Sequence, residues 1–195
     1  MIRVLMLLAL GGLAVFGTPV MAHEVHGYGS GFASGFMHPV LGWDHVAAMV
    51  AVGLWGGVLG RPAIWLLPIV FPLAMAFAAA LGVIGVPLPF VEAGIAASAV
   101  VIGLMIVLLV QPPLPVAVAI VGVFAVFHGH AHGTELPDAV NPFAYALGFV
   151  LSTGLLHAFG IVLGLAIALP FGRAMIRSGG ALISLAGLGF LFGAI

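Results

Sequence analysis

The feature that most constrains this chain is a series of long apolar segments. Each can supply the ~20 residues that an α-helix needs to cross ~30 Å of hydrocarbon, although the last segment is short and the fifth is long. Backbone groups must be paired within lipid, and the segments lack the alternation of a β-barrel, so we expect six transmembrane helices. Short stretches with proline, glycine and the few charged residues separate the segments, which span 33–59, 63–86, 91–110, 114–134, 142–169 and 179–195.

The polar composition excludes several classes of protein. Only 5% of the residues are charged, whereas a soluble domain carries charge on roughly a quarter of them. With four Lys and Arg in total and no basic run, binding to nucleic acid has no electrostatic basis. The chain has no cysteine, which excludes disulfides and thiolate metal sites. We therefore expect an all-α polytopic membrane helix bundle with the lipid bilayer as its surroundings.

The first 22 residues have the pattern of a signal peptide. Arg3 supplies a positive start, an apolar core follows, and Ala22 ends a stretch of small residues suited to cleavage. We expect residues 1–22 to be removed and residues 23–195 to form one six-helix transmembrane domain. Retention of this stretch as an uncleaved first helix is the alternative.

The arginines predict the orientation. Arg61 lies between the first and second apolar segments, and Arg173 and Arg177 lie between the fifth and sixth. These connections share one side of the membrane, which the positive-inside rule assigns to the cytoplasm. We expect a multi-pass protein of the bacterial inner membrane with both mature termini outside, in the periplasm.

A first polar cluster lies near the start of the segment 33–59. His38 and His45 are seven residues apart, so they share one face of a continuous helix at a separation of ~10.5 Å along its axis. Pro39 and Gly42 lie between them and can distort the helix and shorten that distance. Asp44 is adjacent, and an aspartate on a membrane helix is costly and usually functional.

A second polar cluster lies at the end of the segment 114–134. His128, His132 and Glu135 recur at i, i+4 and i+7, so one helix face presents two imidazoles and a carboxylate. A His pair at i, i+4 can chelate one cation. His130 points nearly the opposite way, and we interpret it as a supporting or surface histidine.

The two clusters are expected at the same depth. The first segment enters from outside and the fourth returns to the outside, so both clusters lie in the outer half of the membrane. Four imidazoles and two carboxylates that converge without a neutralising Lys or Arg predict a cation site on an ion pathway. Imidazole and carboxylate ligands suit Ni²⁺, Co²⁺ and Zn²⁺.

Three further histidines have open interpretations. His157 lies deeper, within the segment 142–169, and is either a lower relay point for the ion or a buried histidine bonded to a carbonyl. His23 and His26 either capture metal outside or belong to a solvated tail.

These residues resemble the HupE/UreJ family of nickel and cobalt permeases. The family pattern His-x5-Asp-His matches His38, Asp44 and His45. The pattern Phe-His-Gly-x-Ala-His-Gly-x-Glu matches residues 127–135, with His130 at a variable position. The similarity extends over the whole chain. It implies secondary uptake of Ni²⁺ or Co²⁺, without enzymatic activity.

The sequence thus predicts a permease that imports nickel or cobalt through an intramembrane His/Asp/Glu site, with zinc as a further compatible ion. No Gly-x4-Gly-Lys-Ser/Thr motif is present, and an inside-negative potential can by itself drive a dication inward. We expect no prosthetic group. The sequence leaves open whether the protein forms homo-oligomers.

Two other functions remain open from the sequence. Three histidines and an aspartate can hold a catalytic zinc, which would make the chain an intramembrane zinc-dependent hydrolase. Ser34, Ser152 and Thr153 are possible helpers, although none lies in a recognisable nucleophile motif. A non-transporting metal-binding membrane subunit is the second alternative, although the chain has no soluble domain to report that metal is bound.

Overall fold

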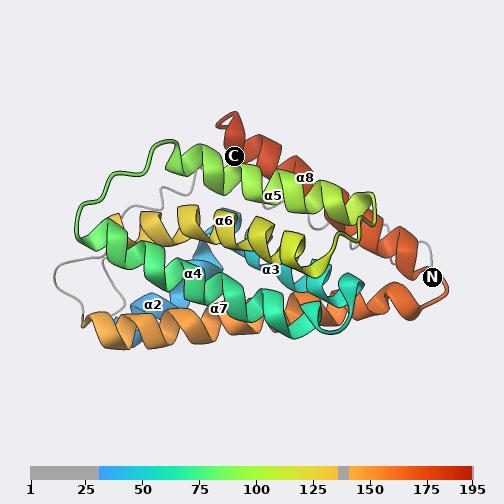
Figure 1. Cartoon of the computed structure of the whole chain (residues 1–195), viewed down its shortest axis with the longest axis horizontal. Coiled ribbons are helices and arrows are strands. Elements are labelled where there is room, and N and C mark those ends of the chain that lie inside the picture. Colours follow the sequence, from blue (N-terminus) through green and yellow to red (C-terminus); the bar gives the residue numbers. More distant parts are fainter. Residues whose placement is uncertain (1–30, 136–140, 195) are drawn as a thin grey trace.

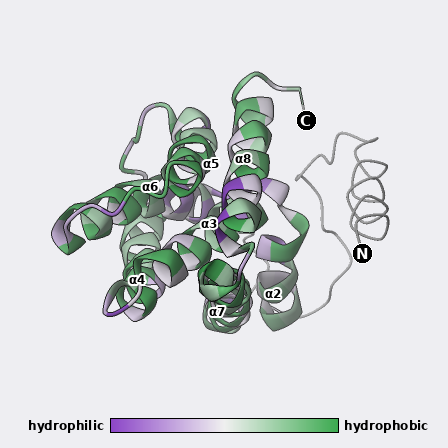
Figure 2. Cartoon of the chain, turned by 90° about the vertical axis from the view of Figure 1, so that its right-hand side faces the viewer, coloured by the Kyte–Doolittle hydropathy of each residue, from purple (hydrophilic) through white to green (hydrophobic). Residues whose placement is uncertain are grey.

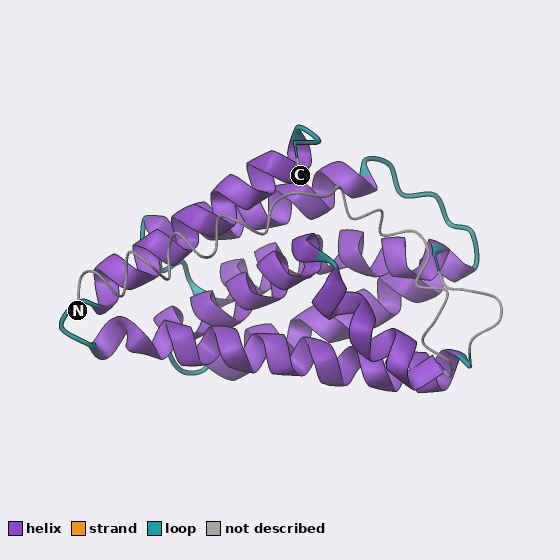
Figure 3. Ribbon diagram, turned by 180° about the vertical axis from the view of Figure 1, so that it is seen from behind, coloured by secondary structure: helices purple, strands orange, loops and turns teal. Residues whose placement is uncertain are grey.

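The computed structural model describes residues 31–135 and 141–194, and within these ranges it contains only helices and loops (Figure 1). Its elements are α2 (Gly31–Leu41), α3 (Trp43–Leu59), α4 (Ala63–Val83), α5 (Val91–Val107), α6 (Leu114–Thr134), α7 (Pro142–Leu165), the 3-10 turn η2 (Ala166–Ala168) and α8 (Gly172–Leu191). Figure 3, which shows the molecule from behind, likewise has no strand in the described ranges. The predicted all-α fold is confirmed.

The helices run roughly along one long axis and form an elongated bundle (Figure 1). The most extensive contacts join α4 to α6, α5 to α8, and α7 to both α2 and α3. Consecutive long helices run in opposite directions. The α3–α4, α5–α6 and α7–α8 connections therefore meet at one end of the bundle, and the α4–α5 connection lies at the other (Figure 1).

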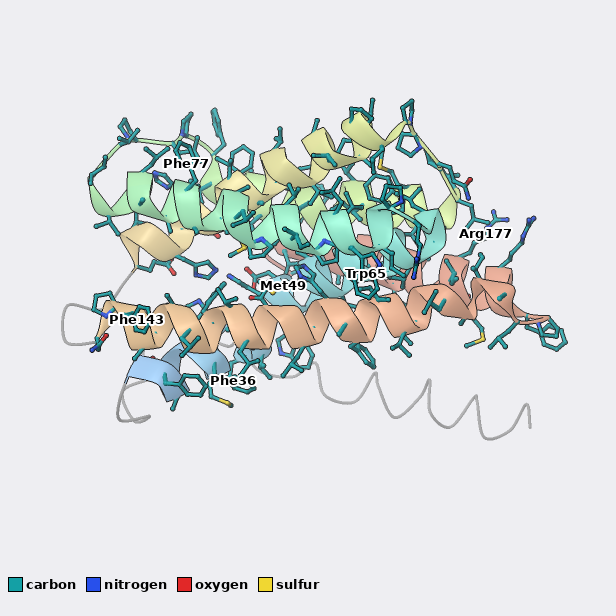
Figure 4. All side chains as sticks on the ribbon, turned by 60° about the horizontal axis from the view of Figure 1, so that its bottom comes forward. Phe36, Met49, Trp65, Phe77, Phe143 and Arg177 are labelled. Carbon is teal, nitrogen blue, oxygen red and sulfur yellow. The ribbon has the colours of Figure 1, made fainter. Side chains whose placement is uncertain are left out.

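The outer surface of the bundle is apolar. Hydrophobic residues dominate the outward faces of the helices (Figure 2). Phe77 is 66% exposed and Phe143 is 79% exposed, whereas Met49 is fully buried. Figure 4 labels these three side chains and shows Met49 among the helices. Large apolar side chains exposed in this way would promote aggregation in water, but they are compatible with contact with the hydrocarbon chains of a bilayer. The chain is a membrane protein.

Helix length bears on the number of spans. By length and composition, four of the described helices can cross a membrane, namely α4, α6, α7 with η2, and α8. The pair α2 and α3 makes a fifth if it counts as one broken span. Helix α5 is apolar but has only 17 residues. Six spans therefore stays a prediction.

Some predicted boundaries were wrong. The last helix begins at Gly172, not at residue 179, so Arg173 and Arg177 lie on its first two turns and not in a loop. A segmentation by hydropathy ends a span at the first charge, whereas Arg, Ala and Met all favour helix and continue it. Helices α4 and α5 end three residues before the predicted limits, at Val83 and Val107.

Glycines allow the central helices to approach closely, and Gly129 and Gly133 on α6 are two examples. A Cβ on either residue would overlap the backbone carbonyl of α4, at Met75 and Ala79 respectively. Helix α6 therefore lies with its backbone directly against α4, in the manner of small-residue contacts between membrane helices. This contact fixes the rotation of α6 and, with it, the direction of the histidines on the adjoining face.

Candidate metal site

The first apolar segment is broken where the His38 cluster lies. Helices α2 and α3 meet at Gly42 with a bend of 78°, and Gly42 itself is extended, with φ −81° and ψ 107°. Pro39 weakens the end of α2 because it has no N–H to donate to the preceding turn. The distortion that Pro39 and Gly42 allowed within the segment 33–59 is thus a full break between two helices. The break brings the His38 and His45 rings to 5.5 Å.

Three helices contribute one imidazole each to a compact cluster. His38 comes from the last turn of α2, His45 from the first turn of α3, and His132 from the last turn of α6. One ring nitrogen of each lies within 4.8 Å of the other two. The Nε2 atoms of His45 and His132 are 2.8 Å apart. We call His38, His45 and His132 the tri-histidine cluster.

Asp44 acts on this cluster through His45. Its Oδ1 atom lies 2.7 Å from His45 Nδ1, and an ionised carboxylate can only accept, so Nδ1 donates. In a neutral His45 ring the Nε2 atom then carries the lone pair and accepts from His132 Nε2–H. A carboxylate that fixes a histidine tautomer in this way is typical of metal sites.

His128 lies next to the cluster, with its ring centroid 5.4 Å from that of His45. Ser98 on α5 donates its hydroxyl proton to the Ile95 carbonyl at 2.6 Å. The Ser98 oxygen therefore accepts from His128 Nε2–H at 3.0 Å. This leaves His128 Nδ1 with a lone pair, and that buried nitrogen has no hydrogen-bond partner within the described ranges.

An apolar crevice leads to His132 from the C-terminal end of α4 and the N-terminal end of α7. It has a volume of about 170 Å³, and its wall includes Val83 and Pro142 at those ends, with His132, Tyr145 and Phe149 further in. The Phe149 ring packs against the His132 ring with centroids 4.5 Å apart. One member of the cluster, His132, thus lines a hollow that is otherwise almost entirely apolar.

Two predicted ligands lie away from the cluster. Glu135 is exposed at the C-terminal cap of α6, where its carboxylate is near enough to Tyr145 to act on it electrostatically. His157 is buried on α7 and contacts Phe71, with ring centroids 5.4 Å apart. His23 and His26 lie outside the described residues, as does the predicted signal peptide.

His130 takes no part in the cluster, as its helical position suggested. Its Nε2 atom donates to the Val86 carbonyl at 2.7 Å, which ties α6 to the α4–α5 connection. It is buried, not on the surface.

The sequence did not single out Ser98 or Phe71. Ser98 is a polar residue in an apolar helix and is fully buried, and such a residue in lipid signals a hydrogen bond to another helix. Phe71 packs against His128, with centroids 5.6 Å apart. A lone phenylalanine in an apolar helix gives no local signal, so only packing reveals its position.

The chemistry of the cluster suits a divalent transition-metal ion. Two imidazoles bound at 90° to one cation at about 2.1 Å have nitrogens about 3.0 Å apart, and about 3.4 Å apart at the tetrahedral angle. The His45 and His132 nitrogens need to separate by only a few tenths of an ångström from 2.8 Å. Neutral imidazoles, a supporting carboxylate and the absence of Lys from the chain favour a cation.

The fold and the site together define a polytopic helical membrane protein with an imidazole-rich cluster suited to a divalent metal. Comparison with known proteins narrows this class. The family model described as HupE / UreJ protein matches residues 10–190. Protein HupE of Rhizobium leguminosarum bv. viciae is 43% identical over 185 residues, which cover 93% of this chain and 95% of that protein. No solved structure matches significantly.

The chain belongs to the HupE/UreJ family, as its two histidine motifs indicated. Members of this family are metal transporters or accessory proteins and not enzymes, and membership implies handling of nickel or cobalt. The hydrolase alternative is thereby set aside.

Proposed function

We propose that this protein is a secondary transporter that imports Ni²⁺ or Co²⁺ across the bacterial inner membrane. The observation that carries the proposal is the tri-histidine cluster, in which the consecutive helices α2 and α3 and the distant helix α6 bring three imidazoles within 4.8 Å of one another. Intramembrane ionisable groups that converge in this way mark ion pathways. The cation is the cargo, and no prosthetic group is needed.

The ligand roles follow from the contacts. His38, His45 and His132 bind the cation directly, and Asp44 orients His45 and compensates charge through the 2.7 Å contact. His128, with its free Nδ1 lone pair beside His45, receives the ion next. Glu135 attracts the ion toward the site, since its carboxylate is exposed at the C-terminal end of α6. His23 and His26 extend this capture role if they follow a cleaved signal peptide of residues 1–22.

The proposed orientation rests on charge. Arg61, Arg173 and Arg177 all belong to the end of the bundle where α3, α5 and α7 finish, and Figure 4 shows Arg177 at that end. Positive charge favours the cytoplasmic side, so the tri-histidine cluster lies in the outer half. This arrangement requires α5 to cross the membrane as a sixth span, and its 17 residues are at the lower limit of what crosses.

Uptake into proteoliposomes tests the function. Purified protein is reconstituted with an inside-negative potential, and accumulation of Ni²⁺, Co²⁺ and Zn²⁺ is followed separately. We expect potential-driven uptake of nickel or cobalt by the wild-type chain, and loss of uptake in His45→Ala and His132→Ala. His130→Ala is the matched control, because it removes a histidine of similar burial from the same helix without touching the cluster, and it should transport at a rate near that of the wild type.

The same experiment distinguishes a transporter from the remaining alternative, a metal-binding subunit. A metal-binding subunit that does not transport would bind nickel or cobalt with His45 and His132 intact but show no uptake above empty liposomes. Equal loss of uptake in His130→Ala and His132→Ala would contradict the assignment of the site.

A further inference from the structure

The rings around the cluster form a continuous column through the bundle. Ring centroids are 4.6 Å apart from His132 to His45, 5.4 Å from His45 to His128, 5.6 Å from His128 to Phe71 and 5.4 Å from Phe71 to His157. His128 and His157 are fully buried, as is Phe71. Four of the five rings are imidazoles, and the exception lies between His128 and His157.

Unpaired polar atoms lie on both sides of Phe71. Among the residues that the structure describes, His128 Nδ1 on one side has no hydrogen-bond partner, and on the other side both ring nitrogens of His157 have none. Thr153, one turn before His157 on the same face of α7, is also fully buried with an unpaired hydroxyl. Buried polar atoms that stay unpaired cost folding free energy and call for an explanation. A cation or its hydration water passing through would satisfy them.

Phe71 interrupts this series of ligands. A phenyl ring has no lone pair to offer, and a buried apolar ring is a barrier to a hydrated dication because it cannot replace the water that the ion would lose. An ion bound at the tri-histidine cluster therefore cannot reach His157 while Phe71 stays between His128 and His157.

Helix α4 is weakened at the position of Phe71. Pro68 and Pro72 lie inside the helix, on either side of this residue. Neither proline has an N–H, so the carbonyls of Ile64 and Pro68 lose their helical partners, and helices bend at such positions. The crevice between α4 and α7 is lined by Pro72, Met75 and Phe149, which gives this part of α4 room to move.

We propose that Phe71 is the gate between two ion stations, the outer tri-histidine cluster and an inner station at His157 and Thr153. Bending of α4 at Pro68 and Pro72 swings the phenyl ring aside and lets the cation pass from His128 to His157. This proposal rests on the proposed transport function, but it concerns the barrier and not the identity of the cargo.

Cysteine labelling tests the gate directly, because the chain has no cysteine of its own. A single cysteine is placed at the inner station by His157→Cys, in an otherwise wild-type chain and in chains that also carry Phe71→Ala. A positively charged, membrane-impermeant thiol reagent is added outside, without transition metal, and modification is measured by mass. Ile102→Ala is the matched control, since Ile102 is also fully buried but lies on α5.

We expect Cys at position 157 to be protected while Phe71 is present and to react at least ~10-fold faster in Phe71→Ala, as when a hydrophobic constriction is removed. Ile102→Ala should leave it protected. Phe71→Leu is a milder change that should also speed up labelling of position 157. It replaces Phe71→Ala in the experiment if that variant fails to insert into the membrane.

The proposal is overturned if the cysteine reacts as fast with Phe71 intact, if Ile102→Ala exposes it equally, or if neither Phe71 variant exposes it. Labelling needs no transported ion, so its outcome is separate from that of the uptake assay. If labelling of position 157 depends on Phe71 but the protein shows no uptake, the proposed transport function is refuted, whereas the assignment of Phe71 as a barrier stands.

Discussion

At the scale of single residues, the contact between Asp44 and His45 distinguishes a residue that binds the metal ion from one that orients a ligand, a distinction that the sequence alone did not make. The sequence placed Asp44 among the metal ligands. From its 2.7 Å contact with His45 Nδ1, we propose that the carboxylate orients His45, whose Nε2 atom lies beside His132 Nε2. The two residues are therefore expected to differ in how much metal affinity they contribute.

Asp44→Asn should weaken metal binding without abolishing it. Loss of the carboxylate relaxes the orientation and tautomer of His45, and removal of such a supporting group typically costs about 10–100-fold in metal affinity. His45→Ala, which removes a ligand, should cost more. Equilibrium binding of Ni²⁺ or Co²⁺ to purified protein measures both, and equal losses would indicate that Asp44 is itself a ligand.

Metal binding should weaken as the solution is acidified. An imidazole binds metal only through an unprotonated nitrogen, so protons and metal compete for the tri-histidine cluster. With histidine ordinarily titrating near pH ~6.5, we expect the apparent affinity to fall between about pH 7.5 and 5.5. Titration calorimetry across this range measures whether the metal affinity falls as the pH is lowered. An affinity independent of pH would argue against imidazole ligands.

At the scale of helices, glycine contacts determine where the histidines point. Helix α6 carries Gly129 and Gly133 against the α4 backbone, and His128 and His132 lie one position away on the adjoining face. The close approach of α6 to α4 thus turns both imidazoles toward the interior. The second helix-scale feature is the break at Gly42, without which His38 would lie about two turns from His45.

Gly129→Ala should destabilise the protein and reduce metal binding. The added methyl group would overlap the Met75 backbone, and such overpacking costs about 1–3 kcal/mol. We expect the Tm in detergent to fall by about 5 °C. Gly154→Ala is the control, because nothing lies within 4 Å of a Cβ there. An unchanged Tm in Gly129→Ala would refute the close α4–α6 contact.

At the scale of the whole molecule, charge is distributed unevenly between the two ends of the bundle. The arginines of the described ranges occur at the end where α3 and α7 finish, whereas Glu92 and Glu135 occur at the opposite end, at the start of α5 and the end of α6. The tri-histidine cluster lies in the half that carries these acidic residues. This polarity suits capture of a cation on one side and release on the other.

Labelling of single cysteines should establish this polarity. Phe90→Cys and Phe171→Cys make the same change at opposite ends, at residues that are 82% and 76% exposed. If the arginine end is cytoplasmic, an impermeant maleimide added to intact cells modifies position 90, and position 171 reacts only after permeabilisation. The reverse pattern would place the tri-histidine cluster on the cytoplasmic side and remove the basis for capture from outside.

Much of this protein was determined by its sequence. Long apolar segments with few charges leave helices in lipid as the stable fold, because unpaired backbone groups are too costly there. The local period of the helix placed His128 and His132 on one face and His130 on another, and this held. The residue types and spacing of the two histidine motifs were by themselves enough to indicate the family.

Only the tertiary structure decided how the site is assembled. The distances between His38, His45 and His132 depend on a helix break and on the contact of α6 with its neighbours, and neither is encoded in spacing along one helix. The structure likewise places Glu135 at the exposed end of α6 and Phe71 between His128 and His157. Local periodicity fixes which face a residue occupies, whereas the faces that meet are selected by close packing of the whole bundle.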